Sequence, residues 1–326
     1  MHMYDVITFG SATRDVFLRT RALDVHREHG VLEACLLFGA KLDVDELTVE
    51  TGGGATNNAV SFSRLAKMKV AAVTKIGNDS AGGDIVAMMK RERIHADFVQ
   101  RDAQGMTGYS SILLSSNAER TILTYRGVSA QIEDAKIPWS KINAKLFHVS
   151  SLGGDLRLFK HILDRAERIG AKVYWNPGSA ELKHGVAALS PLLKRADLVS
   201  LNRDEVALLT GIKADDTRGL IKAMRRLVCE SVITDGENGA YSVSADGVLH
   251  SGILKVDRIN ITGAGDAFFS AYALGYFIYH DRRTALALGT INATGVVQKM
   301  GAKVGILSHL PHKNDLKKVK IKRLSI

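Results

Sequence analysis

The stretch Asn-Ile-Thr-Gly-Ala-Gly-Asp-Ala-Phe, residues 260–268, is a glycine-rich turn that leads into a mostly apolar segment, 267–279. The apolar segment predicts a buried helix, so the N–H groups of Gly263, Ala264 and Gly265 are expected at a helix N-terminus. Free N–H groups and the helix dipole attract anions there, and glycine lets a phosphate approach closely. Asp266 lies in the first turn, where it either caps the helix or acts as a general base beside a phosphate under transfer.

A second glycine-rich segment, Gly-Gly-Gly-Ala-Thr-Asn-Asn-Ala at 52–59, leads into a predicted helix at 58–67. Gly53 and Gly54 permit close approach of the backbone to a ligand, and the amide of Asn57 suits sugar hydroxyls because it both donates and accepts. Taken alone, the segment fits a helix cap in a loop equally well.

Short apolar runs alternate with longer amphipathic stretches along the chain. This alternation predicts βαβ units and a mostly parallel sheet covered on both faces, within one α/β domain over residues 1–326. The predicted strands are 6–9, 70–73, 146–149, 173–175, 198–201 and 232–234, and the predicted helices are 58–67, 82–93, 156–169, 217–228 and 267–279. The P-loop pattern and a complete dinucleotide-binding fingerprint are both absent from the sequence.

Two regions, 17–50 and about 98–128, show period-two alternation instead. Within the second, 109–114 and 121–125 flank a predicted turn at 116–119, which indicates a hairpin. We expect the two regions to form a small β-sheet lid near the glycine-rich segments, with decoration of the fold edge as the alternative.

Charge and composition narrow the class of protein. The formal net charge is +10, and the last fifteen residues supply half of it, with six basic residues against one acid. We therefore expect a solvated, frayed tail and no nucleic-acid partner. No apolar run approaches the roughly 20 residues needed to cross a bilayer, so no membrane role is expected. Cys35 and Cys229 are too few and too far apart for a disulfide framework or a zinc site, which favours a reducing, cytoplasmic location.

Six segments in order make the chain similar to the ribokinase-like (PfkB) carbohydrate kinase family from residue 6 to 305. Two are the glycine-rich segments, and the other four are 75–79, 202–205, 234–239 and 299–302. They match the family's Gly-x-Asp loop, Asn-x-x-Glu motif, nucleotide loop and late Gly-Ala turn. The resemblance implies a three-layer α/β/α sandwich with a small β-sheet lid, and an ATP- and Mg²⁺-dependent kinase.

The resemblance also implies roles for single residues. Asp266 matches the catalytic base, and the N–H groups of Gly263, Ala264 and Gly265 match the anion hole for the transferring phosphoryl group. Glu205 matches the acid that helps to hold Mg²⁺, although a helix start capped by Asn202 is the alternative for this pair. The residues implied for the nucleotide are Asn202, Glu205, Thr234, Gly236, Gly239 and Gly265, and those implied for the acceptor are Asp15, Gly53, Gly54 and Asn57.

Asp15 belongs to the segment 10–15, which follows the first predicted strand and matches the family's sugar-binding aspartate. An ionised carboxylate accepts two hydrogens from a vicinal diol, and ligands of open α/β sheets bind at the carboxyl ends of strands. Thr13 and Ser150 stand where ribokinases carry asparagine and glutamate, so the acceptor need not be ribose. The family's monovalent-cation loop begins here with Asn260 in place of aspartate, which leaves K⁺ activation open.

The leading hypothesis is therefore an ATP-dependent kinase for a sugar hydroxyl. The alternative is a nucleoside kinase of the same fold, with Phe38, Tyr109 and Ile112 forming a slot for the base. A non-catalytic ligand-binding regulator is a third hypothesis, against which the intact Asp266 and Glu205 argue. Besides the small-molecule acceptor, we expect a second copy of the chain as partner, in a homodimer through the lid regions, because an uncovered sheet edge is costly in water.

Overall fold

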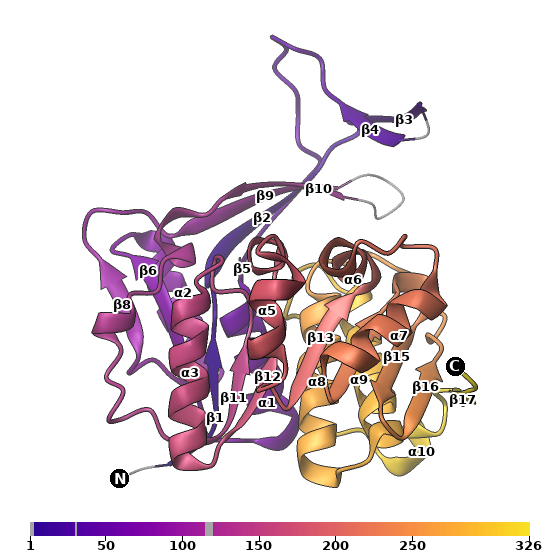
Figure 1. The fold of residues 1–326 in the computed structure, drawn as a ribbon. Helices are drawn as coiled ribbons and strands as arrows, with labels where there is room; N and C mark the ends of the chain where they lie inside the picture. Colours follow the sequence, from indigo (N-terminus) through magenta and orange to yellow (C-terminus); the bar gives the residue numbers. More distant parts are fainter. Residues whose placement is uncertain (1–2, 30, 115–119) are drawn as a thin grey trace.

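The computed structural model describes residues 3–29, 31–114 and 120–326. In this part of the chain an eleven-stranded sheet forms the centre of the molecule (Figure 1). Its parallel part runs in the order β14 (Glu230–Thr234), β13 (Leu198–Asn202), β12 (Lys172–Trp175), β11 (Ala144–Val149), β1 (Tyr4–Phe9), β6 (Val70–Gly77), and β6 pairs with both β7 (Ile94–His95) and β8 (Val99–Asp102). Antiparallel strands β15 (Ala240–Ser244), β16 (Gly247–Ser251) and β17 (Ile321–Leu324) extend the sheet beyond β14.

Helices cover both faces of this sheet. One face carries α3 (Leu156–Ile169), α4 (Ser179–Leu182), α5 (Gly185–Leu193), α6 (Arg203–Thr210) and α7 (Thr217–Leu227), and the other carries α1 (Gly54–Ala66), α2 (Ser80–Arg91), α8 (Ala264–Tyr279) and α9 (Arg282–Val297). Within β1, Ile7 and Phe9 pack on the first layer of helices and Val6 on the second. The predicted three-layer α/β/α fold is therefore confirmed. Within the described ranges, no helix combines the length and the apolar character required to span a bilayer.

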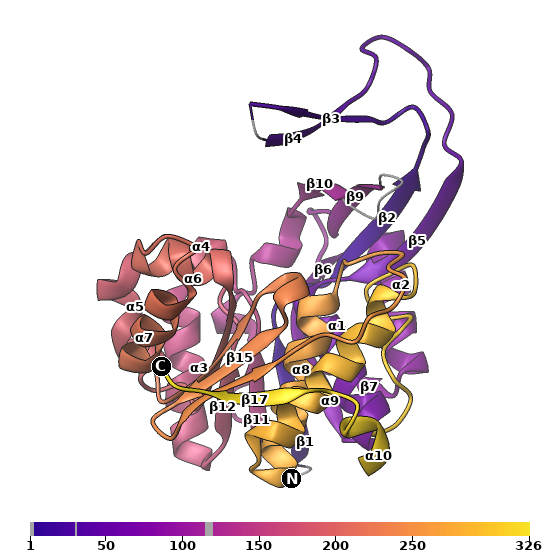
Figure 2. The ribbon, with the colours of Figure 1, turned by 90° about the vertical axis from the view of Figure 1, so that its right-hand side faces the viewer.

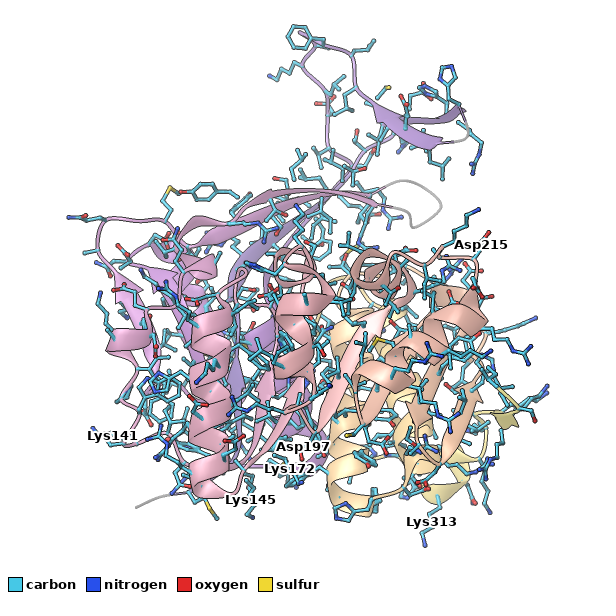
Figure 3. All side chains as sticks on the ribbon, in the orientation of Figure 1. Lys141, Lys145, Lys172, Asp197, Asp215 and Lys313 are labelled. Carbon is cyan, nitrogen blue, oxygen red and sulfur yellow. The ribbon has the colours of Figure 1, made fainter. Side chains whose placement is uncertain are left out.

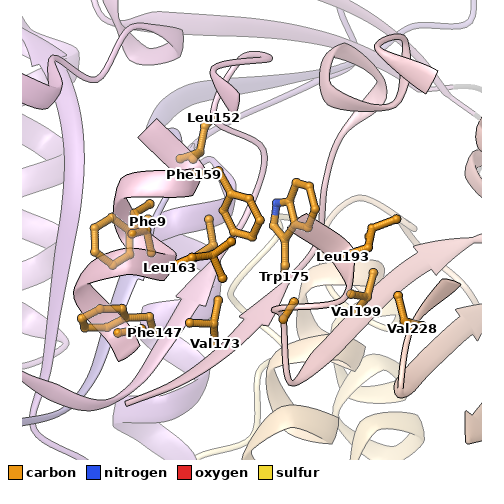
Figure 4. Close-up of a cluster of buried hydrophobic side chains, with 14 of the residues drawn as sticks. Phe9, Phe147, Leu152, Phe159, Leu163, Val173, Trp175, Leu193, Val199 and Val228 are labelled. Atoms are coloured by element: carbon orange, nitrogen blue, oxygen red, sulfur yellow. The ribbon is translucent and has the colours of Figure 1, made fainter. Parts of the chain in front are cut away.

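Aromatic packing fixes α3 against the sheet (Figure 4). The rings of Phe159 on α3 and Trp175 on β12 stack with centroids 3.8 Å apart, and Phe9 and Phe147 meet edge to face at 5.4 Å. All four side chains are fully buried, and burying an aromatic side chain contributes about 1.5–3 kcal/mol. This packing holds β1, β11 and β12 in register, so the loops at their carboxyl ends have fixed positions.

Helix ends follow local signals in the sequence. α3 has the predicted bounds, because Asp155 accepts from the N–H groups of Arg157 and Leu158 and Gly170 ends the helix in the left-handed conformation. α8 begins at Ala264, three residues before the predicted start, because Gly263 caps it with φ 83°.

A second, four-stranded sheet lies over one end of the large one. Its order is β10 (Arg120–Tyr125), β9 (Gly108–Leu114), β2 (Thr13–Arg19) and β5 (Glu46–Gly52), and a hairpin of β3 (Asp24–Glu28) and β4 (Val31–Cys35) reaches far beyond it (Figures 1 and 2). The predicted hairpin is present as β9 and β10, and its predicted turn at 116–119 lies outside the described residues. This lid sheet begins at Thr13, ahead of the predicted region 17–50, and β8 belongs to the large sheet although it falls within 98–128.

The prediction of a frayed basic tail is wrong. Lys313, labelled in Figure 3, begins a short helix α10 (Lys313–Leu316), and β17 then pairs antiparallel with β16. Ile321 and Leu324 pack on opposite faces of the sheet. The tail thus forms an edge strand whose remaining basic residues face water, a common way to protect a sheet edge.

Ion pairs occupy the end of the sheet opposite the lid (Figure 3). Lys172 and Asp197 lie 2.7 Å apart there, and Asp197 also accepts from the N–H of Val173 at 2.9 Å. Exposed pairs of this kind contribute about 0–1 kcal/mol, and they join the amino ends of strands. A ligand site is expected at the other end, where parallel strands terminate.

Candidate functional site

The N-terminus of α8 has the geometry of an anion site. A Cβ on Gly263 would lie 2.6 Å from that of Ala302, so only glycine fits this cap. The Ala264 N–H donates to the carbonyl of Ile261 at 3.3 Å. Among the described residues, nothing accepts the N–H of Gly265 and no atom lies within 4 Å of a Cβ built there. The space above Gly265 is therefore open to a ligand.

Asp266 and Asn57 meet in front of this turn. The first turns of α8 and α1 face each other, and Asn57 Nδ2 donates to Asp266 Oδ2 at 2.8 Å. Asn57 is buried and Asp266 half-buried. The hydrogen bond joins two residues 209 positions apart, which unites the two glycine-rich segments in one site.

Asp15 is a buried residue of the lid strand β2. It lies in β2, where the Thr13 hydroxyl donates to its Oδ1 at 2.9 Å and Ser110 on β9 adds a second hydrogen bond. A Cβ on Gly52 would lie 1.9 Å from Oδ2, so glycine makes room for the carboxylate. Burial raises the pKa of Asp15, while Lys303 and the two hydroxyls lower it.

Gly53 and Gly54 lie beside Asn57 at the start of α1. Gly53 caps the helix with φ 93°, and a Cβ on it would lie 2.4 Å from the carbonyl oxygen of Ser11. At Gly54 a Cβ would lie 2.6 Å from Ser150 Oγ. Close packing of the chain against itself thus accounts for both glycines without a ligand.

Lys303 is a site residue that no sequence motif indicates. It follows α9, is 5% exposed, and its Nζ donates to Asn57 Oδ1 at 2.8 Å and to the carbonyl oxygen of Thr51. Burial lowers the pKa of Lys303 to about 8, against the opposing effect of nearby carboxylates. Its position directly after the Gly-Ala turn at 299–302 is the only signal, since an isolated lysine is normally a surface residue.

The environment of Asp266 suits a proton acceptor. Burial raises the pKa of its carboxyl, and the negative charge of Asp15 adds to that rise. The Asn57 hydrogen bond and the Lys303 ammonium act in the opposite direction. A base is most effective when its pKa approaches the working pH while it stays ionised.

Asn202 and Glu205 form a capping box at the start of α6. The Asn202 side chain accepts from the Glu205 N–H at 2.8 Å, and Glu205 Oε2 accepts from the Asn202 N–H at 2.8 Å. Burial raises the pKa of Glu205, and the charges of Asp266, Asp204 and Glu181 raise it further. The described residues hold no cluster of three or more metal-ligating side chains. Glu205 alone could serve Mg²⁺, because Mg²⁺ is usually held by one or two protein carboxylates together with phosphates and water.

The predicted nucleotide loop lies next to α6. Thr234 ends β14 and lies opposite Asn202 in the sheet, and Arg203 pairs with the buried Asp235 at 3.0 Å. Gly236 and Gly239 adopt φ 51° and 90°, and a Cβ on Gly239 would lie 1.9 Å from the Ser251 carbonyl oxygen. The segments 202–205 and 234–239 are thus neighbours, as a shared nucleotide site requires.

The predicted slot for a nucleoside base does not form. Phe38 is fully exposed on the segment between β4 and β5, which projects beyond the lid sheet that contains β9 (Figure 2). Ile112 is buried against Phe17, whereas Tyr109 is exposed. Their odd spacing on β9 puts Tyr109 and Ile112 on opposite faces of the lid sheet.

Asn260 occupies the start of the predicted monovalent-cation loop. Its side chain is fully buried, its Oδ1 accepts from the Thr262 N–H at 3.0 Å, and its Nδ2 has no acceptor among the described residues. A neutral amide therefore stands where a carboxylate would attract a cation.

An open cavity of about 410 Å³ lies beside the lid. Its lining residues come from the lid strands, from the segment before the turn and from the end of α9: Arg19, Glu46, Arg258, Ile259, Gln298, Lys299 and Met300. Asp15, Asn57 and Asp266 are not among its lining residues, so this cavity is separate from the site built on α1 and α8.

The three-layer fold, with an aspartate in the first turn of a glycine-capped helix at the carboxyl end of the sheet, is that of a ribokinase-like small-molecule kinase. Residues 3–308 match the family described as "pfkB family carbohydrate kinase", and the chain belongs to that family. It is accordingly an ATP-dependent carbohydrate kinase, which phosphorylates a hydroxyl group of a sugar.

Known relatives and solved structures agree with this assignment. The ribokinase of Mus musculus is 29% identical over 289 residues, which cover 85% of this chain and 86% of that protein. The structure of an adenosine kinase from Sinorhizobium meliloti has a TM-score of 0.78 at 18% identity and covers 94% of this chain and 98% of its own. A ribokinase from Arabidopsis thaliana, complexed with ribose and ATP, has a TM-score of 0.76 at 19% identity and covers 97% and 98%. Sugar and nucleoside kinases thus share this fold, and the fold alone does not select the acceptor.

Proposed function

We propose that the chain, as a single α/β kinase domain, transfers the γ-phosphoryl group of ATP to a hydroxyl of a sugar held by Asp15 and Asn57. The observation that carries this proposal is the 2.8 Å hydrogen bond from Asn57 to Asp266. It brings a polar acceptor-side residue to the carboxylate that stands at the open helix N-terminus. An acceptor bound there has its hydroxyl beside both a base and an anion site.

The transfer needs one proton acceptor and one anion site. Asp266 takes the proton from the acceptor hydroxyl, whose oxygen bonds to the γ-phosphorus while the bond to the bridging oxygen of ADP breaks. The N–H groups of Gly263, Ala264 and Gly265, with the dipole of α8, stabilise the negative charge on the transferring group.

In this proposal the neighbouring segments 202–205 and 234–239 bind the nucleotide. We assign Asn202, Thr234, Gly236 and Gly239 to ATP, because the end of β14 and the start of α6 lie side by side. When bound, Mg²⁺ would neutralise charge on the phosphates, and Glu205 is the carboxylate that fits it, through water. Gly265 offers its free N–H to the same phosphates.

The acceptor is a sugar with two adjacent hydroxyls. Asp15 already accepts from Thr13 and Ser110, and its remaining lone pairs can accept from a diol. A coupled ADP-release screen against pentoses, hexoses, sugar acids, sugar phosphates and nucleosides identifies the acceptor, and release with a sugar is the expected result. Release with nucleosides only would favour the nucleoside alternative, and release with none would contradict the proposal. Each reaction is run in K⁺ and in Na⁺, because the neutral Asn260 argues for weak K⁺ dependence.

Glu205→Gln should raise the Mg²⁺ concentration needed for half-maximal activity several-fold. The glutamine still accepts from the Asn202 N–H, so the capping box and the fold survive while one negative charge is lost. Activity is measured against MgCl₂ concentration at fixed ATP. Asp215→Asn removes an exposed acid outside this turn and serves as the control. An unchanged Mg²⁺ requirement in Glu205→Gln would assign Glu205 to capping alone.

We propose that two copies associate through the lid. The lid strands and the segment before β5 expose many large apolar side chains, which are costly to leave in water. They are Leu32, Leu36, Leu37, Phe38, Val44, Leu47, Val49, Ile122, Leu123 and Tyr125.

Sedimentation velocity at micromolar concentration should show a dimer. Leu123→Asp on β10 should shift it to monomer, whereas Leu208→Asp, at another exposed position, on α6, should not. A wild-type protein that sediments only as monomer would contradict the dimer.

We place the protein in the cytoplasm. Cys35 and Cys229 are free and exposed, and exposed thiols persist in a reducing compartment.

A further inference from the structure

Lys303 has a rigid backbone anchor. Its carbonyl oxygen accepts from Arg64 Nη1 at 3.0 Å and from the Ile306 N–H at 3.1 Å. Two residues on, a Cβ at Gly305 would lie 2.0 Å from the Gly295 carbonyl oxygen, so the loop packs directly on α9. The ammonium group therefore enters the site from a fixed point.

The ammonium orients the amide of Asn57. Lys303 Nζ donates to Asn57 Oδ1 at 2.8 Å, and Asn57 Nδ2 donates to Asp266 Oδ2 at 2.8 Å. A flipped amide would face its NH₂ group toward the ammonium and its oxygen toward the carboxylate, and both contacts would be repulsive. Lys303 thus selects the orientation in which Asn57 holds Asp266.

Four acids from different elements face the ammonium. They are Asp15 on β2, Glu50 on β5, Asp266 on α8 and Glu92 at the end of α2. Arg64 neutralises Glu92, from which its Nη2 lies 2.6 Å. The charge of Lys303 lowers the pKa of both Asp15 and Asp266, against the effect of their burial. A buried carboxylate without such an opposite charge would take up a proton.

We propose that Lys303 is a positioning residue for phosphoryl transfer: through Asn57 it orients the Asp266 carboxylate, and its charge keeps Asp266 and Asp15 ionised. This inference rests on the proposed role of Asp266 as the base. The low pKa of Lys303, about 8, means that alkaline pH removes the charge.

The test compares pH profiles of kcat and KM for Lys303→Met, Lys303→Arg and wild type, with ATP and the best acceptor from the screen. At pH 7, Lys303→Met should lower kcat at least about tenfold with little change in the KM for ATP. Its acidic limb should move up by about one to three pH units, because the carboxylates lose an opposite charge. The alkaline limb near pH 8 should disappear, since the titrating group is gone.

Lys303→Arg should restore most of kcat and extend activity to higher pH, because guanidinium stays charged. Lys90→Met, which removes an exposed lysine from α2, should behave as wild type. A wild-type profile in Lys303→Met would overturn the proposal. So would an equal loss at every pH in both the methionine and arginine variants, which indicates a role in folding only.

A second readout needs no activity. Between pH 8 and 10.5 the unfolded chain holds a proton on this lysine that the folded chain has released, so wild-type stability gains a rising contribution with pH. Urea unfolding measures it: the free energy of unfolding of wild type minus that of Lys303→Met should rise over this pH range. If the screen finds no acceptor but the rise is present, the proposed function fails while the buried ammonium stands. If the rise is absent, the inference about Lys303 fails.

Discussion

Asp266→Asn is expected to lower turnover about a hundredfold or more, the usual contribution of a general base. The asparagine oxygen can still accept from Asn57 Nδ2, so the contact between α1 and α8 survives. What disappears is the ability to take a proton from the acceptor hydroxyl. Asp15 does not replace Asp266 in this proposal, because Asp15 holds the acceptor from the lid strand β2 and does not stand at the N-terminus of α8.

The measurement is kcat from ADP release, together with ATP affinity by calorimetry. ATP affinity should be nearly unchanged, since the nucleotide segments lie on β14 and α6. Asp215→Asn, at an exposed acid labelled in Figure 3, is the matched control and should keep wild-type turnover. Turnover near the wild-type value in Asp266→Asn would remove Asp266 from the role of base.

Lowering the pH should reduce the activity of the wild type, because protonation of Asp266 removes the base as Asp266→Asn does. Burial raises the pKa of Asp266 above the ordinary value of 3.8, so protonation begins at a higher pH than for an exposed aspartate. Activity should fall as pH drops through that raised pKa, because the neutral carboxylic acid accepts no proton. The pH profile of the residual activity of Asp266→Asn should show no such acidic limb.

The layers of the fold could be predicted because each element has its own local signal. The runs 146–149 and 173–175 are continuous and apolar, as buried parallel strands require, and α3 carries a cap at each end. The antiparallel strands β15, β16 and β17 escaped prediction. In β17 two apolar residues lie among lysines and arginines, and such a charged terminal segment predicts a solvated tail. Only its pairing with β16 shows that it is a strand.

The site could be predicted only in pieces. The two glycine-rich segments are recognisable in the sequence. The hydrogen bond between Asn57 and Asp266 that joins them depends on the packing of α1 on α8. Lys303 escaped altogether, because its character comes from burial among acids of four separate elements. The slot expected from Phe38, Tyr109 and Ile112 does not form for a related reason. Strand alternation puts Tyr109 and Ile112 on opposite faces of β9, and Phe38 is exposed on a projecting segment.

Asp15→Ala is expected to raise the acceptor KM at least about tenfold, which corresponds to about 1.4 kcal/mol. The buried carboxylate would accept from two adjacent hydroxyls, and a hydrogen bond to a charged group contributes about 1.5–3 kcal/mol. The KM for ATP should change little, because Asp15 lies in the lid strand β2 and the nucleotide segments lie in the C-terminal half. Turnover should also fall, since a loosely held hydroxyl is poorly aligned with Asp266.

The kinetics vary each substrate at saturating levels of the other, with the best acceptor from the screen. Asp43→Ala, at an exposed acid between β4 and β5, is the control and should leave both KM values unchanged. The pH profile adds an independent check, because the charge of Asp15 raises the pKa of Asp266. Its removal should shift the acidic limb to lower pH, opposite to the shift expected for Lys303→Met. If Asp15→Ala instead weakened ATP binding and left the acceptor KM untouched, the assignment of the two half-sites would be reversed, and Asp15 would belong to the nucleotide.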